Sequence, residues 1–250
     1  MQPDAYCFHR SFEPAPASQF QVDRHYLLYA LEGTLRLEAG GQRWTLPPAR
    51  AALIKADHPI NITVLSRLTS ASVLFSTQFM EEPENVLTVF DMSPLARELV
   101  RECRDWGAES GPLSPFSERI FRTLADVVQR LAMTPSKCVL PSPKSEALRK
   151  AVALTEELAP AAPTFEVIAK QTNQSPRALA RRFADEMGMT WREVLRQIRI
   201  MNAVEALATT DAQVTEIAMS VGYGSLSGFN AAFRQQMQMS PTEYRASFTS

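Results

Sequence analysis

The sequence is poor in cysteine and histidine. Its 250 residues contain three of each, and the cysteines, Cys7, Cys103 and Cys138, lie far apart. They form neither a metal-binding spacing nor an even-numbered disulfide framework, which is typical of a chain kept in a reducing compartment. We therefore expect no metal site, no disulfide and no bound cofactor.

Long apolar runs and an excess of basic residues are also missing. No run of about 18 apolar residues occurs, and no basic segment followed by an apolar one stands near the N-terminus. The chain has 26 Lys and Arg against 27 Asp and Glu, and 45% of its residues are hydrophobic. This composition predicts a soluble, cytoplasmic protein of one or two domains, each with a sizeable core and no membrane contact.

The most informative stretch is residues 213–245, which predict a short helix, a glycine turn and a second helix. Gly222-Tyr223-Gly224 ends the first helix, because glycine adopts the left-handed conformation that a tight turn needs. Ser225 and Ser240-Pro241 begin the next two helices as N-caps. Apolar residues recur at helical spacing on both sides of the turn: Val214, Ile217, Ala218, Val221, Phe229 and Phe233.

A similar unit precedes it. Thr164 is expected to cap a helix over residues 165–171, with a turn at Asn173-Gln174. Ser175-Pro176 begin a second helix that Gly188 ends, and Thr190 caps a long helix to about Thr209. Leu179 and Phe183 repeat the spacing of Phe229 and Phe233, so the two units are weak internal repeats.

These motifs resemble the signature of the AraC/XylS family of bacterial transcription regulators over about residues 145–250. The matching positions are Ile217-Ala218, Val221-Gly222-Tyr223, Ser225, Ser227, Phe229, Phe233-Arg234, Ser240-Pro241 and Tyr244-Arg245. Family members usually have a glycine where this chain has Gln238, so we expect a less tight turn there. The resemblance implies two helix-turn-helix units joined by a long helix, with each monomer spanning two successive major grooves of double-stranded DNA.

The resemblance places base reading in the first unit at Arg177, Ala180 and Arg181. An arginine can donate two hydrogen bonds to the major-groove edge of guanine. Alternatively, these arginines contact only phosphates or solvate the helix face, and Arg182 suits a phosphate or structural contact. The candidate residues of this first recognition helix are Arg177, Ala178, Ala180, Arg181 and Arg182.

The second recognition helix offers fewer polar contacts. Asn230 suits adenine, Leu226 or Ala231 a thymine methyl group, and Arg234 a phosphate. Residues 145–250 carry 11 basic and 11 acidic side chains, so we expect specific binding to depend on base contacts and dimerisation. The candidate residues of this helix are Ser225, Leu226, Ser227, Asn230, Ala231 and Arg234.

The first 80 residues predict β-structure. Gly40-Gly41 marks a hairpin, and the expected strands are 25–31, 34–39, 42–46, 50–55, 60–65 and 71–77. This region resembles the small β-barrel of the cupin superfamily, which many AraC-type regulators use as a sensor. The resemblance rests on Tyr29, Glu32-Gly33, Gly41, Leu46-Pro47-Pro48, Ile54 and His58-Pro59.

The barrel lacks the ligands of metal-dependent cupins. Asp23-Arg24-His25 has no paired histidine, and Tyr26 stands where a ligand glutamate is usual. One interpretation of the barrel mouth is a site for a small-molecule effector, where a histidine and an arginine together would suit an anion. The other is an interior filled by the barrel's own side chains. The candidate effector residues are Arg24, His25, Tyr26, Tyr29 and His58.

The predicted fold class is α+β: a cupin-like barrel followed by two amphipathic helices, then an all-α domain of two helix-turn-helix units. We expect the helices to begin at Ser93-Pro94 and at about Phe116, and either to pack on the barrel or to form a homodimer. The expected segments are 1–18 (a loosely ordered N-terminal arm), 19–80 (barrel), 81–133 (helical connector), 134–144 (linker) and 145–250 (DNA-binding domain).

The sequence thus favours a DNA-binding transcription regulator without catalytic residues. By resemblance, it is an activator that responds to an effector and contacts RNA polymerase. Two alternatives remain open at this point. One is a metal-dependent cupin enzyme fused to a DNA-targeting domain, and the other is a constitutive DNA binder whose barrel serves only for dimerisation.

Overall fold

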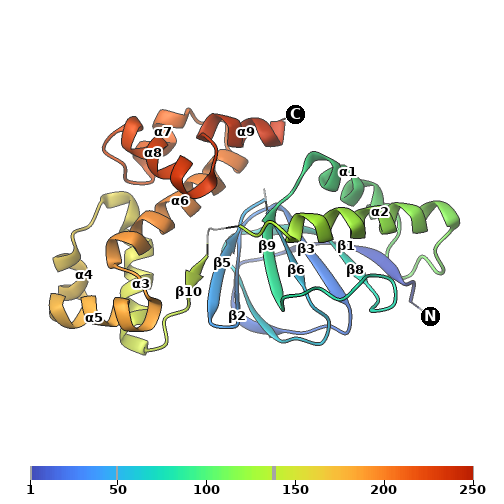
Figure 1. Cartoon of the computed structure of the whole chain (residues 1–250), viewed down its shortest axis with the longest axis horizontal. Helices are drawn as coiled ribbons and strands as arrows, with labels where there is room; N and C mark the ends of the chain where they lie inside the picture. The colour runs from blue at the N-terminus through green and yellow to red at the C-terminus, as the bar shows by residue number, and fades with distance from the viewer. Residues whose placement is uncertain (1, 49, 137–138, 250) are drawn as a thin grey trace. The chain divides into compact units, whose positions relative to one another are not determined.

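The protein is described by a computed structural model, which covers residues 2–48, 50–136 and 139–249 (Figure 1). It divides into two compact units. One contains residues 1–40, 44–136 and 247–250, and the other contains residues 41–43 and 137–246. Cys138, one of the three cysteines noted above, lies outside the described residues.

The N-terminal unit is built from two antiparallel sheets. The order of the first sheet is β1-β8-β3-β6-β9, and that of the second is β10-β5-β4-β7-β2. The strands are β1 (Ala5–Phe12), β2 (Ala15–Phe20), β3 (His25–Glu32), β4 (Leu35–Ala39), β5 (Gln42–Leu46), β6 (Arg50–Ile54), β7 (Ile60–Val64), β8 (Leu68–Phe75), β9 (Leu87–Asp91) and the two-residue β10 (Leu140–Pro141), which belongs to the C-terminal unit. The six predicted strands are therefore confirmed, with shifts at their ends.

Alternation along β3 assigns its side chains to two faces. Leu27 and Tyr29 lie on the face that packs against helices, whereas Tyr26 and Leu28 face the space between the two sheets. The two predicted helices are α1 (Pro94–Glu102) and α2 (Pro115–Ala132), with a 3-10 turn, η1 (Cys103–Asp105), between them. They cover the outer face of the first sheet, which is one of the two arrangements that the sequence left open.

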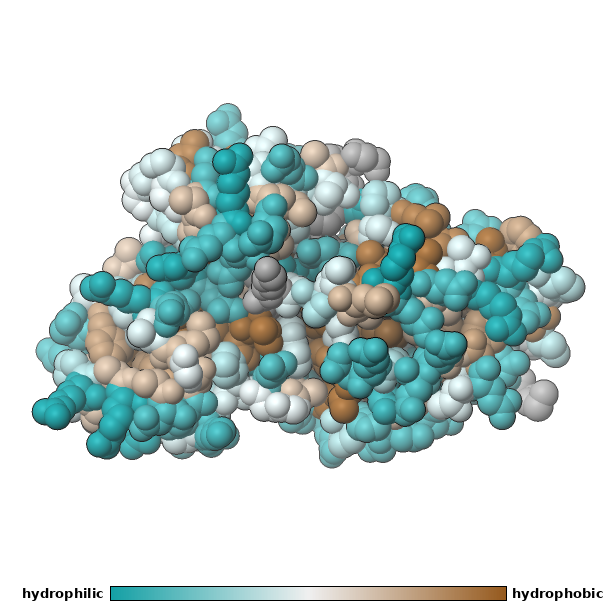
Figure 2. All heavy atoms as spheres, viewed as in Figure 1, coloured by the Kyte–Doolittle hydropathy of each residue, from teal (hydrophilic) through white to brown (hydrophobic). Residues whose placement is uncertain are grey.

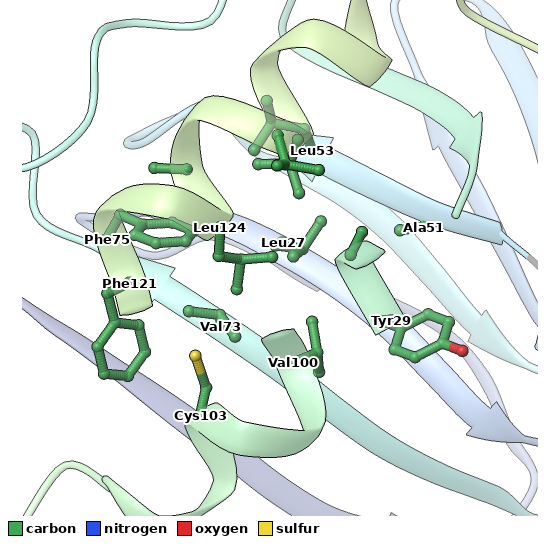
Figure 3. Packing of buried hydrophobic residues seen from close by; sticks show 14 of the residues in the cluster. Leu27, Tyr29, Ala51, Leu53, Val73, Phe75, Val100, Cys103, Phe121 and Leu124 are labelled. Atoms are coloured by element: carbon green, nitrogen blue, oxygen red, sulfur yellow. The ribbon is translucent and has the colours of Figure 1, made fainter. Parts of the chain in front are cut away.

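The core of this unit lies between the first sheet and those helices. Figure 3 shows Leu27, Val73 and Phe75 of the sheet facing Val100, Phe121 and Leu124 of the helical layer. Cys7 and Cys103 are free thiols within this cluster, and burial raises the pKa of Cys7 to about 11. Both cysteines therefore act as packing residues.

Two expectations for this unit were wrong. The segment 1–18 is not a loosely ordered arm, because β1 pairs with β8 and β2 with β7. Pro16 is tolerated within β2 because β2 is an edge strand whose register shifts between Ala15 and Ser18, and Pro3 and Pro14 lie outside the strands. The connector 81–133 is also not wholly helical, since β9 pairs with β6 at the other edge of the first sheet.

The C-terminal unit is helical. Its helices are α3 (Glu146–Leu158), α4 (Phe165–Gln171), α5 (Pro176–Met187), α6 (Trp191–Thr209), α7 (Val214–Ser220), α8 (Leu226–Met237) and α9 (Pro241–Thr249), with a 3-10 turn, η2 (Ala159–Ala161), after α3. Helices α4 and α5 form the first helix-turn-helix, α6 is the long connecting helix, and α7 and α8 form the second. This confirms the predicted α+β class.

Local capping explains where these helices begin. The side chains of Thr164, Ser175, Thr190 and Ser225 each accept a hydrogen bond from the backbone of the first turn, as predicted. Ser240 and Glu243 are hydrogen-bonded to each other. The Glu243 carboxylate accepts from the backbone N–H and from the hydroxyl of Ser240, at 2.7 Å each. Such a capping box satisfies donors that the start of a helix leaves free.

The turn after α8 is as tight as its counterpart after α5. Gln238 adopts the left-handed conformation with φ 60° and ψ 14°, close to Gly188 with φ 64° and ψ 19°. The expectation of a looser turn at Gln238 was therefore wrong. The side chain is accommodated at the cost of a conformation that glycine adopts more readily.

Candidate functional site

Helix α5 presents an exposed, basic face. Arg177, Ala180 and Arg181 are exposed, while Leu179 and Phe183 are buried on the opposite side. Ala178 is half-buried, and its backbone N–H is occupied by the Ser175 cap. Figure 2 shows strongly hydrophilic side chains gathered over the region that α5 occupies in Figure 1. Two arginines one helical turn apart thus project together from this helix.

Arg182 makes a structural contact within α5. Its Nη1 lies 3.6 Å from the carboxylate of Glu186. Glu186 also accepts hydrogen bonds from the backbone N–H groups of Lys144 and Ser145 at 3.0 and 2.7 Å, and from the Ser145 hydroxyl at 2.7 Å. Desolvation opposes these hydrogen bonds, but they prevail and hold the pKa of Glu186 below its usual value. Arg182 and Glu186 therefore help to fix α5 to the start of α3.

Helix α8 presents a less charged face. Ser225, Ser227, Ala231 and Arg234 are exposed, and Leu226 and Asn230 are half-buried. Ser225 is engaged as the N-cap, because its Oγ accepts from the Gly228 N–H at 3.2 Å. Arg234 is the one cation of α8, so this helix offers mainly small polar and apolar groups.

Arg199 of α6 joins the turn of the second helix-turn-helix to η2, the 3-10 turn that precedes the first. Its Nε and Nη2 both donate to the carbonyl oxygen of Ala159 at 3.1 Å, and its guanidinium lies 5.7 Å from the Tyr223 ring. Gly222 fits against the same two groups: a Cβ there would lie 2.4 Å from the Ala159 oxygen and 2.9 Å from the Arg199 guanidinium nitrogens Nε and Nη2. Gly222 is thus needed for close approach as well as for its φ of 94°.

The turn of the first unit has the same local geometry. Gln174 N–H donates to Ala169 O at 2.9 Å, and Tyr223 N–H donates to Ala218 O at 3.0 Å. Asn173, at the position equivalent to Gly222, is also left-handed, with φ 54°, but it is exposed. The predicted repeat is therefore present in the backbone, and its two turns differ in how closely they are packed.

The five candidate effector residues do not come together at one mouth. Arg24 donates to the carbonyl oxygens of Pro3 and Asp4 at 2.9 and 3.2 Å and lies 5.2 Å from the Tyr6 ring. Tyr29 faces the helical layer, at a groove shared with Arg97 and Arg101. Both are engaged in structural contacts on the first sheet.

The two histidines contact Ala56, in the segment that follows β6. His25 is 2% exposed, and its Nδ1 accepts from the Ala56 N–H at 3.1 Å, while His58 Nδ1 lies 2.7 Å from the Ala56 carbonyl oxygen. Burial lowers the pKa of His25, which favours its neutral form. Only Tyr26 of the five candidates lines a cavity between the two sheets.

Sequence reasoning missed three features that the structure reveals. These are the Arg199 contact with Ala159, the capping role of Glu186, and the cavity that Tyr26 lines. The first two join residues about 40 positions apart, and no local spacing signals such pairs. The alternation of side chains along β3 could have indicated the third feature, the cavity that Tyr26 lines.

In the part of the chain that the structure describes, no helix is long and apolar enough to cross a membrane. Among residues 2–48, 50–136 and 139–249, no three His, Cys, Asp or Glu side chains are grouped as a metal site requires.

Comparison with known proteins identifies the C-terminal unit. A family model described as a helix-turn-helix domain matches residues 168–247. The regulatory protein SoxS of Escherichia coli K12 is 35% identical over 81 residues, which cover 32% of this chain and 76% of SoxS. The transcriptional activator RhaR of an Enterobacter strain is also 35% identical over 81 residues, but these cover 29% of RhaR.

A further relative aligns along almost the whole chain. The transcriptional regulator NimR of Escherichia coli K12 is 24% identical over 251 residues, covering 98% of this chain and 88% of NimR. Among solved structures, ToxT from Vibrio cholerae O395 aligns with 99% of both chains at 15% identity and a TM-score of 0.44.

The helix-turn-helix match covers both recognition helices and the long helix between them. SoxS is matched over three quarters of its own length, so the similarity extends well beyond a single motif. The two capped helix-turn-helix units have the order and spacing that the family signature requires. With these findings together, the chain belongs to the AraC/XylS family of transcription regulators.

Proposed function

We propose that the protein recognises specific promoter sequences through α5 and α8, and that α5 does most of the base reading. The observation that carries this proposal is the exposed pair Arg177 and Arg181, one turn apart on the outward face of α5. A guanidinium that bonds the O6 and N7 of guanine contributes about 1–3 kcal/mol of discrimination. Ala180, between them, leaves room for the base edges to approach.

Helix α8 supplies anchoring and shape recognition. Its exposed face carries Ser227 and Ala231 and one cation, Arg234, which suits a phosphate rather than a base. The half-buried Asn230 carries an amide that suits adenine. Arg199 joins the segment that precedes α4, through Ala159, to the turn that precedes α8, through Tyr223. These contacts support a rigid frame that binds two successive major grooves on one face of the DNA.

The N-terminal unit is proposed to control this binding. It has its own core and a cavity between its sheets, as expected of an effector-binding domain. We further infer that the protein acts as a homodimer, activates transcription through contact with RNA polymerase, and works in the cytoplasm without enzymatic activity. The names of RhaR and SoxS, an activator and a regulatory protein, support the regulatory part of this proposal.

Sequencing of genomic fragments captured by the purified protein tests the DNA proposal. The expected result is enrichment of a motif with two blocks about one helical turn apart. An Arg177→Ala/Arg181→Ala variant should lose at least one block, because each arginine contributes about 1–3 kcal/mol. Arg149→Ala is the control, since it removes an arginine from α3, with 58% of the side chain exposed, elsewhere in the same unit.

An unchanged motif in the double variant would show that α5 does not read bases through these arginines. Uniformly weaker binding to all sequences, with the motif retained, would assign them to phosphates instead.

A further inference from the structure

A cavity of about 400 Å³ lies between the two sheets of the N-terminal unit. The first sheet contributes residues of β1, β3 and β8, and the second contributes residues of β2, β4 and β7. Most of its wall is aliphatic or aromatic, and the side chains that matter most here are Phe8, Phe20, Leu28, Leu35, Ile62 and Val64. Residues from both layers of one unit therefore line this space.

The unit does not fill this space with its own side chains. Ile62 and Val64 of β7 line the cavity and yet are only half-buried, and Phe12 of β1 remains 36% exposed. Protein interiors are close-packed, and voids much larger than a water molecule are few. Apolar side chains held open around such a volume are typical of a ligand pocket.

The charges around the cavity exclude an anionic ligand. Among the described residues that line it there is no lysine, arginine or histidine. The one carboxylate, Glu13, has a side chain that is 79% exposed and lies 3.7 Å from the Arg67 guanidinium. A charged ligand would thus lose its hydration without gaining a partner, which is strongly unfavourable.

One polar cluster is available inside. The Ser70 and Ser72 hydroxyls lie 2.6 Å apart, and both bond the Tyr26 hydroxyl. Burial raises the pKa of Tyr26 to about 12, so this phenol stays neutral. Tyr26 and Ser70 both line the cavity, and a hydroxyl oxygen has two lone pairs, so the cluster can accept a hydrogen bond from a ligand.

We propose that this cavity binds a neutral, largely apolar molecule that carries one hydroxyl group, which donates to the Tyr26 and Ser70 cluster. An apolar cavity of about 150 Å³ holds benzene, so about 400 Å³ suits a ligand of roughly 16 non-hydrogen atoms or fewer. This assignment names the effector class of the regulatory domain and so rests on the proposed function. It replaces the anionic ligand that Arg24 and His25 suggested from the sequence.

Calorimetric titration with 2-naphthol and 2-naphthoate tests this assignment on the full chain. The two probes share one ring system, but the first is neutral and the second an anion at pH 7. We expect saturable binding of 2-naphthol. We expect 2-naphthoate to bind at least about tenfold more weakly, because its charge would lose its hydration in the cavity. Equal affinity for the two probes, or no binding of 2-naphthol, overturns the proposal.

Two matched substitutions locate the site. Ile62→Trp fills the cavity from β7 and should abolish 2-naphthol binding, whereas Leu65→Trp places the same side chain at a position that is 41% exposed and does not line the cavity. Tyr26→Phe should weaken 2-naphthol about three- to tenfold and leave naphthalene unaffected, because it removes one hydrogen bond. Unchanged 2-naphthol binding in Ile62→Trp, with its circular dichroism preserved, also overturns the assignment.

The same protein preparation separates this proposal from the DNA proposal. Protein that enriches a DNA motif but binds no 2-naphthol refutes the ligand assignment and leaves the regulator intact. Protein that binds 2-naphthol with the expected selectivity but enriches no motif, in the presence or absence of 2-naphthol, supports the cavity and refutes the DNA proposal.

Discussion

Substitution of Gly222 by alanine tests how the second helix-turn-helix is fixed to its frame. The added methyl group would lie 2.4 Å from the Ala159 carbonyl oxygen and 2.9 Å from two nitrogens of Arg199. Ordinary van der Waals contact is about 3.5–4.0 Å. Either the turn or the Arg199 guanidinium must therefore move. In both cases the two 3.1 Å hydrogen bonds from Arg199 to the Ala159 carbonyl oxygen are strained.

The expected loss of stability has two parts. A residue other than glycine in the left-handed region costs about 1–2 kcal/mol. Overpacking of a closed contact costs about 1–3 kcal/mol more. We therefore expect Gly222→Ala to lower the free energy of unfolding of the C-terminal unit by about 2–5 kcal/mol.

Gly188→Ala is the matched control. Gly188 also has a left-handed backbone, with φ 64°, but a Cβ there would meet no atom within 4 Å. This substitution should cost only the conformational part, about 1–2 kcal/mol. The difference between the two variants then measures the contact with Ala159 and Arg199.

Urea unfolding followed by tryptophan fluorescence can make this measurement in the full chain. The sequence has three tryptophans, and Trp191 is the one in the C-terminal unit, where it is 7% exposed. A Trp44→Phe/Trp106→Phe background leaves Trp191 as the sole reporter of that unit. Equal losses for Gly222→Ala and Gly188→Ala would refute the reasoning, because the close approach at Gly222 would then carry no energy.

Two further substitutions in the same unit have expected outcomes of opposite sign. Gln238→Gly should raise the free energy of unfolding by up to about 1 kcal/mol, because Gln238 has a left-handed backbone that glycine adopts without strain, and this relief outweighs the loss of the exposed hydrogen bond from its side-chain amide to the Gln235 carbonyl oxygen. Urea unfolding measures it, and no gain would mean that Gln238 makes compensating contacts. Glu186→Gln should lower stability by about 1–2 kcal/mol at pH 7, because it weakens charge-assisted hydrogen bonds from Lys144 and Ser145. The pKa of Glu186 is lowered in the folded chain, so its contribution is present above the unfolded value of about 4.3 and is lost as the pH falls through the folded value. The gap between wild type and variant should therefore close in acid, and a gap that persists at pH 2 would contradict this account.

The helical unit was predictable because its signals are local. Ser175 and Ser225 cap helices within three residues of themselves, and Gly188 ends one through its own backbone conformation. Gln238 was misjudged because the same left-handed turn forms without glycine. What remained hidden was the contact of Arg199 with Ala159, which depends on how α3 and α6 pack.

The sheet unit was predictable in its strands but not in its site. Alternation correctly marked β3, yet Tyr26 and Tyr29 are three positions apart and so lie on opposite faces of that strand. The prediction that they lie together at one mouth of the barrel was therefore wrong, and the two-residue period of a strand was enough to show it. The missed strands β1 and β2 contain or flank prolines, and only their pairing with β8 and β7 reveals them.

The two turns of the repeat show how one local motif serves two purposes. Asn173 and Gly222 occupy equivalent left-handed positions. Asn173 is exposed, so its side chain has space, whereas Gly222 packs closely against Ala159 and Arg199. The closed turn belongs to the unit whose recognition helix has one cation, and the open turn to the unit with the exposed arginine pair. Since Arg199 lies on the helix that joins both units, closing the second turn against it holds α8 at a fixed separation from α5. Under the proposed function, a helix with little charge of its own can then contribute to binding, because the frame would present it to the next major groove once α5 has bound the DNA.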